Sequence, residues 1–123
     1  MSTIRVVLAE NNADLRSALQ GAIDDEADLA CVASTGLFGE VVGLAERHDA
    51  DVVVLDLELD GGSALPLLAT LRAARPQTRC LIHSGHSNAA IVRGALDAGA
   101  SAYVIKSGDV DALTSAIRES VRP

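Results

Sequence analysis

Five polar side chains stand where short apolar runs of this sequence end. Glu10 and Asn11 follow the first run, Asp56 the third, Ser84 the fourth and Lys106 the fifth. The carboxyl ends of parallel strands meet at one edge of a sheet. If these runs are strands of one parallel sheet, two acids, an amide, a hydroxyl and an ammonium converge on one cleft.

Such a cleft has the parts that a phosphoryl-accepting carboxylate needs. An ionised aspartate is a nucleophile, and Asp56 is the candidate. Oxygen ligands from acids and backbone carbonyls suit Mg²⁺. A lysine and a hydroxyl, here Lys106 and Ser84, can bind the remaining phosphoryl oxygens. Catalysis would consist of positioning and charge neutralisation.

The elements that must position these residues alternate along the chain. Apolar, β-branched runs predict strands, and apolar residues three or four apart predict helices. The predicted strands are 4–9, 29–34, 51–55, 79–83 and 102–105, and the predicted helices are 12–26, 37–48, 63–75, 88–98 and 109–121. Alternation with short connections predicts an α/β fold. The expected form is a flavodoxin-like (βα)5 doubly wound, five-stranded parallel sheet in the order 2-1-3-4-5.

Local signals set several of these boundaries. Pro66 falls in the first turn of its helix, where a missing N–H is tolerated. Pro76 ends that helix, and Gly99 is a C-terminal cap of the next. Asp109 is a candidate N-cap of the last helix.

Composition narrows the class of protein. The chain has 123 residues, 49% of them hydrophobic, and a net charge of −7. This acidity argues against direct nucleic-acid binding. No apolar run is long enough to span a membrane and the N-terminus does not resemble a signal peptide, so a cytoplasmic location is expected. Cys31 and Cys80 fall on the predicted second and fourth strands, roughly 14 Å apart, too far for a disulfide.

Three segments carry a resemblance to a known family. Residues 51–63 resemble the phosphorylation-site segment of receiver domains of two-component response regulators. Residues 81–85 resemble the segment with their Ser or Thr, and residues 99–106 resemble their Gly-Ala-x-x-Tyr-x-x-Lys segment. The similarity covers residues 1–123 as one receiver domain. It is greatest to LuxR/NarL-type receivers, which precede a C-terminal helix-turn-helix output domain.

The resemblance implies a role for each matching residue. Asp56 would accept phosphate from a histidine kinase. Ser84 would bind the phosphoryl group and shift with it, while Lys106 would pair with the phosphate. Tyr103 would report the switch by changing its rotamer. Such a domain is not an enzyme beyond residual autophosphorylation and autodephosphorylation. It would contact DNA only through a separate output domain, and it would not contact a membrane.

The metal site departs from the family pattern. The resemblance implies Mg²⁺ held by Glu10, Asn11, Asp56 and the backbone carbonyl of Glu58. Receivers usually end their first strand with two acids, whereas this chain has Glu10 and Asn11. One missing carboxylate at ~4 Å is worth roughly 1–4 kcal/mol per unit charge. Glu10, one methylene longer than Asp, either reaches in to compensate or leaves the metal site weak.

Two alternatives follow from the same residues. The Glu10–Asn11 pair also motivates a second interpretation, an atypical receiver that acts without phosphorylation as a protein-interaction or dimerisation module. A homodimer through the first and last helices, or through the fourth helix, fifth strand and last helix, is compatible with either reading. A dinucleotide enzyme is disfavoured because the loop after the first strand contains no glycine.

The remaining ionisable side chains are expected at the surface. His83 and His86 are interpreted as loop or surface residues and His48 as exposed. Four arginines are interpreted as parts of solvated helix faces: Arg16, Arg72, Arg75 and Arg118. Ser107 stands where many receivers have proline, so no cis bond is expected before it.

Overall fold

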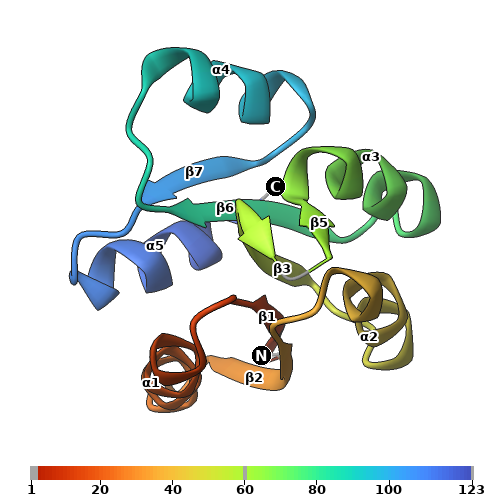
Figure 1. The fold of residues 1–123 in the computed structure, drawn as a ribbon. Helices are drawn as coiled ribbons and strands as arrows, with labels where there is room; N and C mark the ends of the chain where they lie inside the picture. Colours follow the sequence, from red (N-terminus) through yellow and green to blue (C-terminus); the bar gives the residue numbers. More distant parts are fainter. Residues whose placement is uncertain (1–2, 60, 123) are drawn as a thin grey trace.

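A five-stranded parallel sheet lies at the centre of the computed structural model, which describes residues 3–59 and 61–122 (Figure 1). Its strands are β1 (Ile4–Ala9), β2 (Leu29–Thr35), β3 (Val52–Asp56), β6 (Arg79–Ser84) and β7 (Ala102–Ile105). They lie in the order β2-β1-β3-β6-β7. The predicted order 2-1-3-4-5 is therefore confirmed. Asp60 of the motif quoted above, together with residues 1, 2 and 123, lies outside the described residues.

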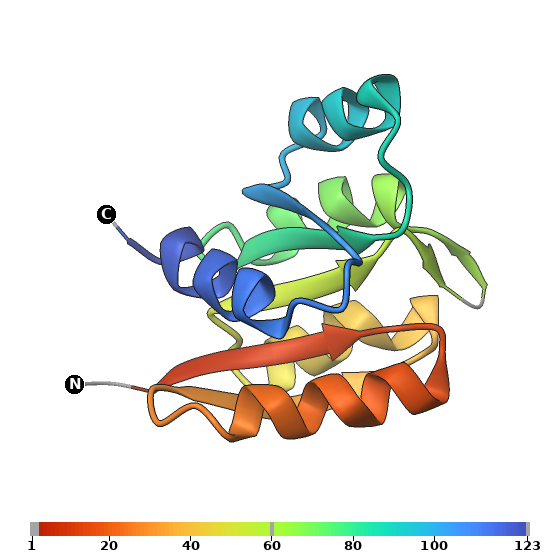
Figure 2. The same cartoon turned by 90° about the vertical axis from the view of Figure 1, so that its left-hand side faces the viewer.

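Helices cover both faces of this sheet (Figures 1 and 2). On one face lie α1 (Ala13–Asp24) and α5 (Val110–Ser120), and on the other α2 (Val41–Arg47), α3 (Ala64–Ala74) and α4 (Ala89–Asp97). Successive side chains of a strand point to opposite faces, so both faces need an apolar cover. In the described parts of the chain, no helix is both long and apolar enough to cross a bilayer.

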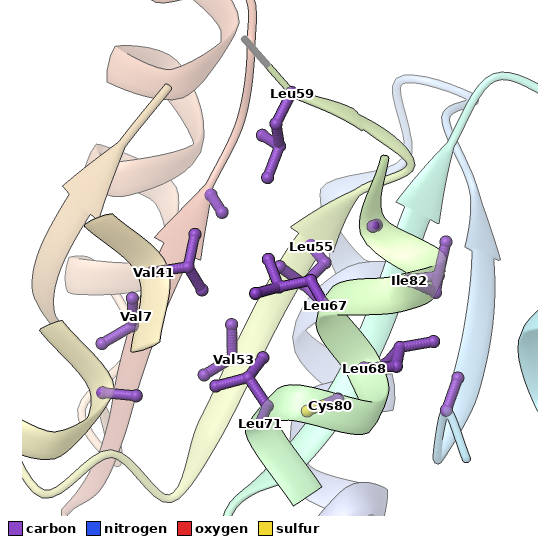
Figure 3. Packing of buried hydrophobic residues seen from close by; sticks show 14 of the residues in the cluster. Val7, Val41, Val53, Leu55, Leu59, Leu67, Leu68, Leu71, Cys80 and Ile82 are labelled. Carbon is purple, nitrogen blue, oxygen red and sulfur yellow. The ribbon is translucent and has the colours of Figure 1, made fainter. Parts of the chain in front are cut away.

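The central strand β3 shows how the sequence forms two cores. All five of its residues are buried. Val53 and Leu55 pack with α2 and α3, whereas Val52 and Val54 pack with α1 and α5. Figure 3 shows the first core, where Val53 and Leu55 lie beside Leu67 and Leu71 of α3. Aliphatic side chains fill both cores, as the scarcity of aromatic residues requires.

The two cysteines occupy separate strands. Cys31 lies on β2 and Cys80 on β6, with β1 and β3 between them, and both are free. Burial raises the pKa of each thiol to about 11. Both thiols are therefore protonated and unreactive near neutral pH.

The predicted boundary signals are found in the structure. The side chain of Asp109 accepts a hydrogen bond from the Ala112 N–H at 3.2 Å and caps α5. Pro66 falls in the first turn of α3, and that helix ends just before Pro76. Gly99, with φ at +112°, follows α4 in the left-handed conformation of a helix C-cap. The peptide bond before Ser107 is trans.

Two short elements differ from the prediction. The chain after β3 forms a hairpin of β4 (Glu58–Leu59) and β5 (Gly62–Ser63) before α3 begins. Strands of two residues are too short to show an alternating pattern. The predicted helix 37–48 begins instead as a 3₁₀ turn, η1 (Phe38–Glu40), whose Phe38 ring packs against Gly62 of the hairpin.

Candidate functional site

The predicted site residues line one cavity of about 270 Å³ at the carboxyl edge of the sheet. Its walls contain all six residues proposed for phosphoryl transfer and metal binding: Glu10, Asn11, Asp56, Glu58, Ser84 and Lys106. Asn12, Gly85 and His86 complete the lining. Residues from four separate segments of the sequence therefore share one pocket.

The strand register explains this convergence. Asp56 of β3 lies opposite His83 of β6, so Ser84 follows one residue beyond the end of β3. The backbone N–H of Lys106 donates to the carbonyl oxygen of Ser84 at 2.7 Å, which places the start of the β7–α5 loop beside the same edge. Parallel neighbours of similar length thus bring their last residues together.

The ammonium of Lys106 lies between the two acids of the pocket. Its Nζ is 2.9 Å from Oε1 of Glu10 and 3.3 Å from Oδ2 of Asp56. Glu10 is 1% exposed and Asp56 is 8% exposed. Two largely buried carboxylates therefore share one positive charge.

Two backbone amides orient the carboxylate of Asp56. The N–H of Asn11 donates to Oδ2 at 3.2 Å, and the N–H of Glu58 donates to Oδ1 at 3.3 Å. Each donor restricts the rotamer of the Asp56 side chain. The orientation of the Asp56 carboxylate in the cavity is therefore fixed from both of its oxygens.

Glu10 faces inward rather than toward solvent. Its Oε2 accepts a hydrogen bond from the Asn12 N–H at 3.0 Å, while Oε1 pairs with Lys106. Burial raises the pKa of Glu10 above its usual value, against the lowering influence of the Lys106 ammonium and the Asn12 N–H. The longer side chain of Glu10 therefore reaches the pocket, but it binds the lysine there.

Ser84 and Tyr103, the two candidate switch residues, are joined through one loop residue. Ser84 is 1% exposed, and its Oγ accepts a hydrogen bond from the N–H of His86 at 3.1 Å. The hydroxyl of the half-buried Tyr103 donates to the carbonyl oxygen of His86 at 2.8 Å. Through His86, the β6–α4 loop is thus hydrogen-bonded both to Ser84 in the pocket and to Tyr103 of β7.

Sequence reasoning missed the pair that stands at the mouth of this cavity. Nε2 of His86 lies 3.3 Å from Oε1 of Glu58, and both side chains are exposed. The only signal was positional, since Glu58 follows Asp56 by two residues and His86 follows Ser84 by two. The surface location predicted for His86 is correct, but its partner could not be read from spacing alone.

The surface location predicted for His83 is wrong. His83 is the fifth residue of β6 and only 7% exposed. Burial lowers its pKa to about 4, and the charge of Lys106 adds to this effect while that of Asp56 opposes it. The imidazole is therefore neutral at pH 7. His48, predicted to be exposed, is half-buried, and its carbonyl oxygen accepts a hydrogen bond from Nε of Arg5 at 2.7 Å.

Three of the four arginines make specific contacts that the prediction of solvated faces did not include. Arg16 donates to the carbonyl oxygen of Glu10 at 2.8 Å. Arg75 pairs with Asp49 at 2.7 Å, with 11% of its side chain exposed. Arg118 pairs with Glu26 at 2.6 Å and with Asp28 at 2.8 Å. Arg72 is exposed, as predicted.

The cavity offers oxygen ligands but few free charges for a cation. Within the described residues, no three His, Cys, Asp or Glu side chains cluster in a metal-binding arrangement. Asp56, the exposed Asn11 and Glu58 all line the pocket. The oxygen atoms that these residues can offer suit a hard cation such as Mg²⁺.

A doubly wound sheet whose carboxyl edge holds an oriented aspartate, a lysine and a buried serine defines a receiver-type signalling domain. Comparison with known families agrees, because the family described as the response regulator receiver domain matches residues 6–118. The chain therefore belongs to the receiver domains of two-component response regulators.

Curated proteins with similar sequences include a response regulator and a transcriptional activator. The chain is 28% identical over 118 residues to the nitrate/nitrite response regulator protein NarP of Escherichia coli (strain K12), covering 96% of this chain and 55% of NarP. It is 29% identical over 103 residues to the DNA-binding transcriptional activator DevR/DosR of Mycobacterium tuberculosis, covering 84% of this chain and 48% of that protein. The chain thus spans about half the length of these relatives.

Solved structures give the same family. A LuxR-family two-component response regulator from Aurantimonas sp. SI85-9A1 superposes with a TM-score of 0.89 at 32% identity, over 96% of this chain and 84% of that one. The signal receiver domain of a response regulator named NarL from Mycobacterium tuberculosis, 24% identical, shows the same fold, with a TM-score of 0.91 over 97% of this chain and 96% of its own. The predicted likeness to LuxR/NarL-type receivers is confirmed.

Proposed function

We propose that Asp56 is the phosphoryl acceptor of this domain and that a histidine kinase is the donor. The observation that carries the proposal is the position of the Lys106 ammonium, 3.3 Å from Oδ2 of Asp56 in a cavity shared with Ser84. A carboxylate oxygen of Asp56 forms a bond to phosphorus while the bond between phosphorus and the donor nitrogen breaks. The nitrogen keeps the electron pair, and Asp56 becomes an acyl phosphate.

The residues around Asp56 have separate tasks in this reaction. Lys106 binds a phosphoryl oxygen and compensates the negative charge that enters the pocket. The N–H groups of Asn11 and Glu58 keep the carboxylate oriented for attack. Ser84 offers its hydroxyl to the phosphoryl group once it turns from the His86 N–H. Any movement of Ser84 and His86 would also act on Tyr103, which is bonded to the same loop residue.

Mg²⁺ would be held by the Asp56 carboxylate, the Asn11 amide oxygen and the backbone carbonyl of Glu58, with Glu10 adding negative charge nearby. When bound, the ion supplies positive charge to the phosphoryl oxygens. Its affinity is expected to be low, because Asn11 is uncharged and Glu10 is paired with Lys106. Glu10 becomes a direct ligand only if it leaves that lysine.

The wider context follows from the relatives. NarP is a response regulator by name, and DevR/DosR is a DNA-binding transcriptional activator by name. We infer that residues 1–123 act as one receiver domain that regulates transcription through an output domain, pairs with a histidine kinase in the cytoplasm and forms a homodimer.

A second candidate function rests on the same lysine. Because Lys106 already pairs with both Glu10 and Asp56, the pocket holds a positive charge without an added cation. A domain of this kind can also serve as a phosphorylation-independent interaction or dimerisation module. This alternative predicts that the protein is a dimer and that neither Mg²⁺ nor a phosphodonor changes its mass.

Intact mass spectrometry distinguishes the two functions. The protein is incubated with Mg²⁺ and acetyl phosphate, and we expect the mass to rise by one phosphoryl group. Asp56→Asn should abolish this gain, whereas Asp97→Asn, which changes an exposed aspartate on α4, should keep it. An unmodified wild-type protein, or equal labelling of Asp56→Asn, would overturn the assignment of Asp56.

A further inference from the structure

A single peptide unit connects the acceptor aspartate to a side chain outside the acceptor pocket. The carbonyl oxygen of Glu10 accepts a hydrogen bond from Nη1 of Arg16 at 2.8 Å. The N–H of the same peptide unit, which belongs to Asn11, donates to Oδ2 of Asp56 at 3.2 Å. A trans peptide unit is planar and rigid, and its C=O and N–H groups point in opposite directions. Fixing the carbonyl oxygen of Glu10 therefore also fixes the direction of the N–H group that meets Asp56.

Arg16 acts on this backbone rather than on an acidic side chain. Among residues 3–59 and 61–122, its guanidinium forms no ion pair. It lines a neighbouring cleft of about 420 Å³ instead of the acceptor pocket, and Asn11 lines both spaces. A cation at a carbonyl oxygen polarises the peptide and makes its N–H a stronger donor. The guanidinium can thus both orient and strengthen the hydrogen bond to Asp56.

Gly36, just after β2, leaves the space that the guanidinium needs. A Cβ atom at this position would lie 2.6 Å from Nη1 of Arg16 and 3.3 Å from the carbonyl oxygen of Glu10. The preceding residue, Thr35, accepts a hydrogen bond from the Glu10 N–H at 2.9 Å through its carbonyl oxygen. The end of β2 therefore holds the backbone of Glu10, and the absent side chain at position 36 admits Arg16 beside it.

We propose that Arg16 is a positioning residue for Asp56, acting through the Glu10–Asn11 peptide, and that Gly36 is required because it admits the guanidinium. This inference rests on the proposed phosphoryl transfer to Asp56. Without Arg16, the peptide is free to turn, and the carboxylate loses one of its two amide donors. A nucleophile that is less often in the reactive orientation attacks phosphorus more slowly.

Two substitutions remove the same hydrogen bond in different ways. Arg16→Met keeps the apolar stem and removes the donors. Gly36→Ala keeps every atom of Arg16, but its methyl group displaces the flexible end of that side chain. Each should slow labelling of Asp56 by acetyl phosphate and Mg²⁺ about threefold to tenfold, the value of one hydrogen bond. The double variant should be no slower than the slower single variant, because both changes remove one bond.

Each substitution has a matched control. Arg47→Met removes an exposed arginine from the last turn of α2. Gly39→Ala adds a methyl group in η1, where a Cβ atom meets nothing within 4 Å. Both controls should be labelled at the wild-type rate. Labelling of Arg16→Met at that rate would overturn the role of Arg16, and the same result for Gly36→Ala would overturn the role of Gly36.

The amide proton of Asn11 gives a readout that needs no phosphoryl transfer. In the ¹⁵N-labelled protein without phosphodonor, its resonance should move upfield in Arg16→Met and Gly36→Ala and stay in place in both controls. Resonances far from the pocket should not move, as they would if the fold were loosened. An unchanged Asn11 amide in both variants would overturn the proposal, even if labelling were slow. A wild-type protein that takes up no phosphoryl group would instead overturn the acceptor function, while the Asn11 amide still shows whether Arg16 controls this peptide.

Discussion

Oε1 of Glu10 lies 2.9 Å from Nζ of Lys106, which makes the two residues an ion pair inside the acceptor pocket. Glu10 is almost fully buried, whereas 24% of the Lys106 side chain is exposed. A buried carboxylate is stable only with a partner of opposite charge. Lys106 therefore stabilises the folded state through Glu10, in addition to its proposed role beside Asp56. These two effects can be measured separately.

Removal of the Lys106 charge should destabilise the fold. Lys106→Met keeps the apolar stem and leaves Glu10 without its cation. We expect a loss of about 2–3 kcal/mol in the free energy of unfolding, below the range for fully buried pairs because the lysine is partly exposed. Adding Glu10→Gln to Lys106→Met should recover at least half of that loss, measured by urea denaturation.

A matched control for this cycle is the exposed pair of Arg122 and Glu119. Arg122→Met removes a cation from the same chain, but from a solvated pair that contributes little. Its unfolding midpoint should equal that of the wild type. If Lys106→Met also unfolds at the wild-type midpoint, Glu10 does not depend on the lysine.

Restoring an acid at position 11 should strengthen metal binding. Asn11 lines the acceptor pocket beside Asp56, and Asn11→Asp adds one negative charge there. A carboxylate at ~4 Å from a divalent cation gives an expected gain in Mg²⁺ affinity of at least about tenfold. Isothermal titration with MgCl₂ measures the dissociation constant directly.

Asn88→Asp provides the control for charge alone. Asn88 is the N-cap of α4 and its side chain accepts from the N–H groups of Ala90 and Ile91, a role that aspartate also fills. This variant should bind Mg²⁺ as the wild type does. Equal gains at positions 11 and 88 would mean that general charge, rather than a ligand in the pocket, sets the affinity.

The strands and the residues at their ends could be predicted because their signals are local. Asp56, Ser84 and Lys106 each follow an apolar run, and the parallel topology alone brings them together. The partners of buried polar groups could not be predicted, since they depend on register and rotamer. Sequence patterns do not show that Glu10 turns to Lys106 or that Arg118 reaches Asp28, 90 residues away.

The packing of Gly62 against Phe38 is another contact that sequence patterns do not show, and it gives a third prediction. A Cβ atom at Gly62 would lie 2.7 Å from Cδ2 of the Phe38 ring. Gly62→Ala should therefore displace the ring or the hairpin and destabilise the protein by about 1–2 kcal/mol. Thermal unfolding followed by circular dichroism measures the change.

Gly43→Ala is the control for this glycine. Gly43 lies in α2, and a Cβ atom there meets nothing within 4 Å. Alanine at that position should stabilise the helix by about 0.5–1 kcal/mol. Opposite signs for the two substitutions are the expected outcome, and a stabilising Gly62→Ala would contradict the contact.

The buried histidine makes stability depend on pH. The pKa of His83 is lowered to about 4 in the folded state from a usual value of 6.5. The unfolded chain therefore binds a proton between pH 6.5 and about 4 that the folded chain does not. Binding of that proton stabilises the unfolded state relative to the folded state. The contribution of neutral His83 to the free energy of unfolding is therefore complete above pH 6.5 and is lost as pH falls toward 4. The full loss is roughly 3 kcal/mol.

The raised pKa of Glu10 acts in the opposite sense, because it lowers stability as pH rises above the usual value of 4.5. The comparison that isolates His83 is therefore the stability of wild type minus that of His83→Leu, from urea denaturation at several pH values. Both proteins carry Glu10, so its effect largely cancels in the difference. Below pH 6.5, the usual pKa of the imidazole, we expect the free energy of unfolding of the wild type to fall steadily relative to that of His83→Leu. A difference that does not change with pH would mean that the imidazole takes up its proton in the folded protein as readily as in the unfolded chain, and that it is not shielded between α1 and α5.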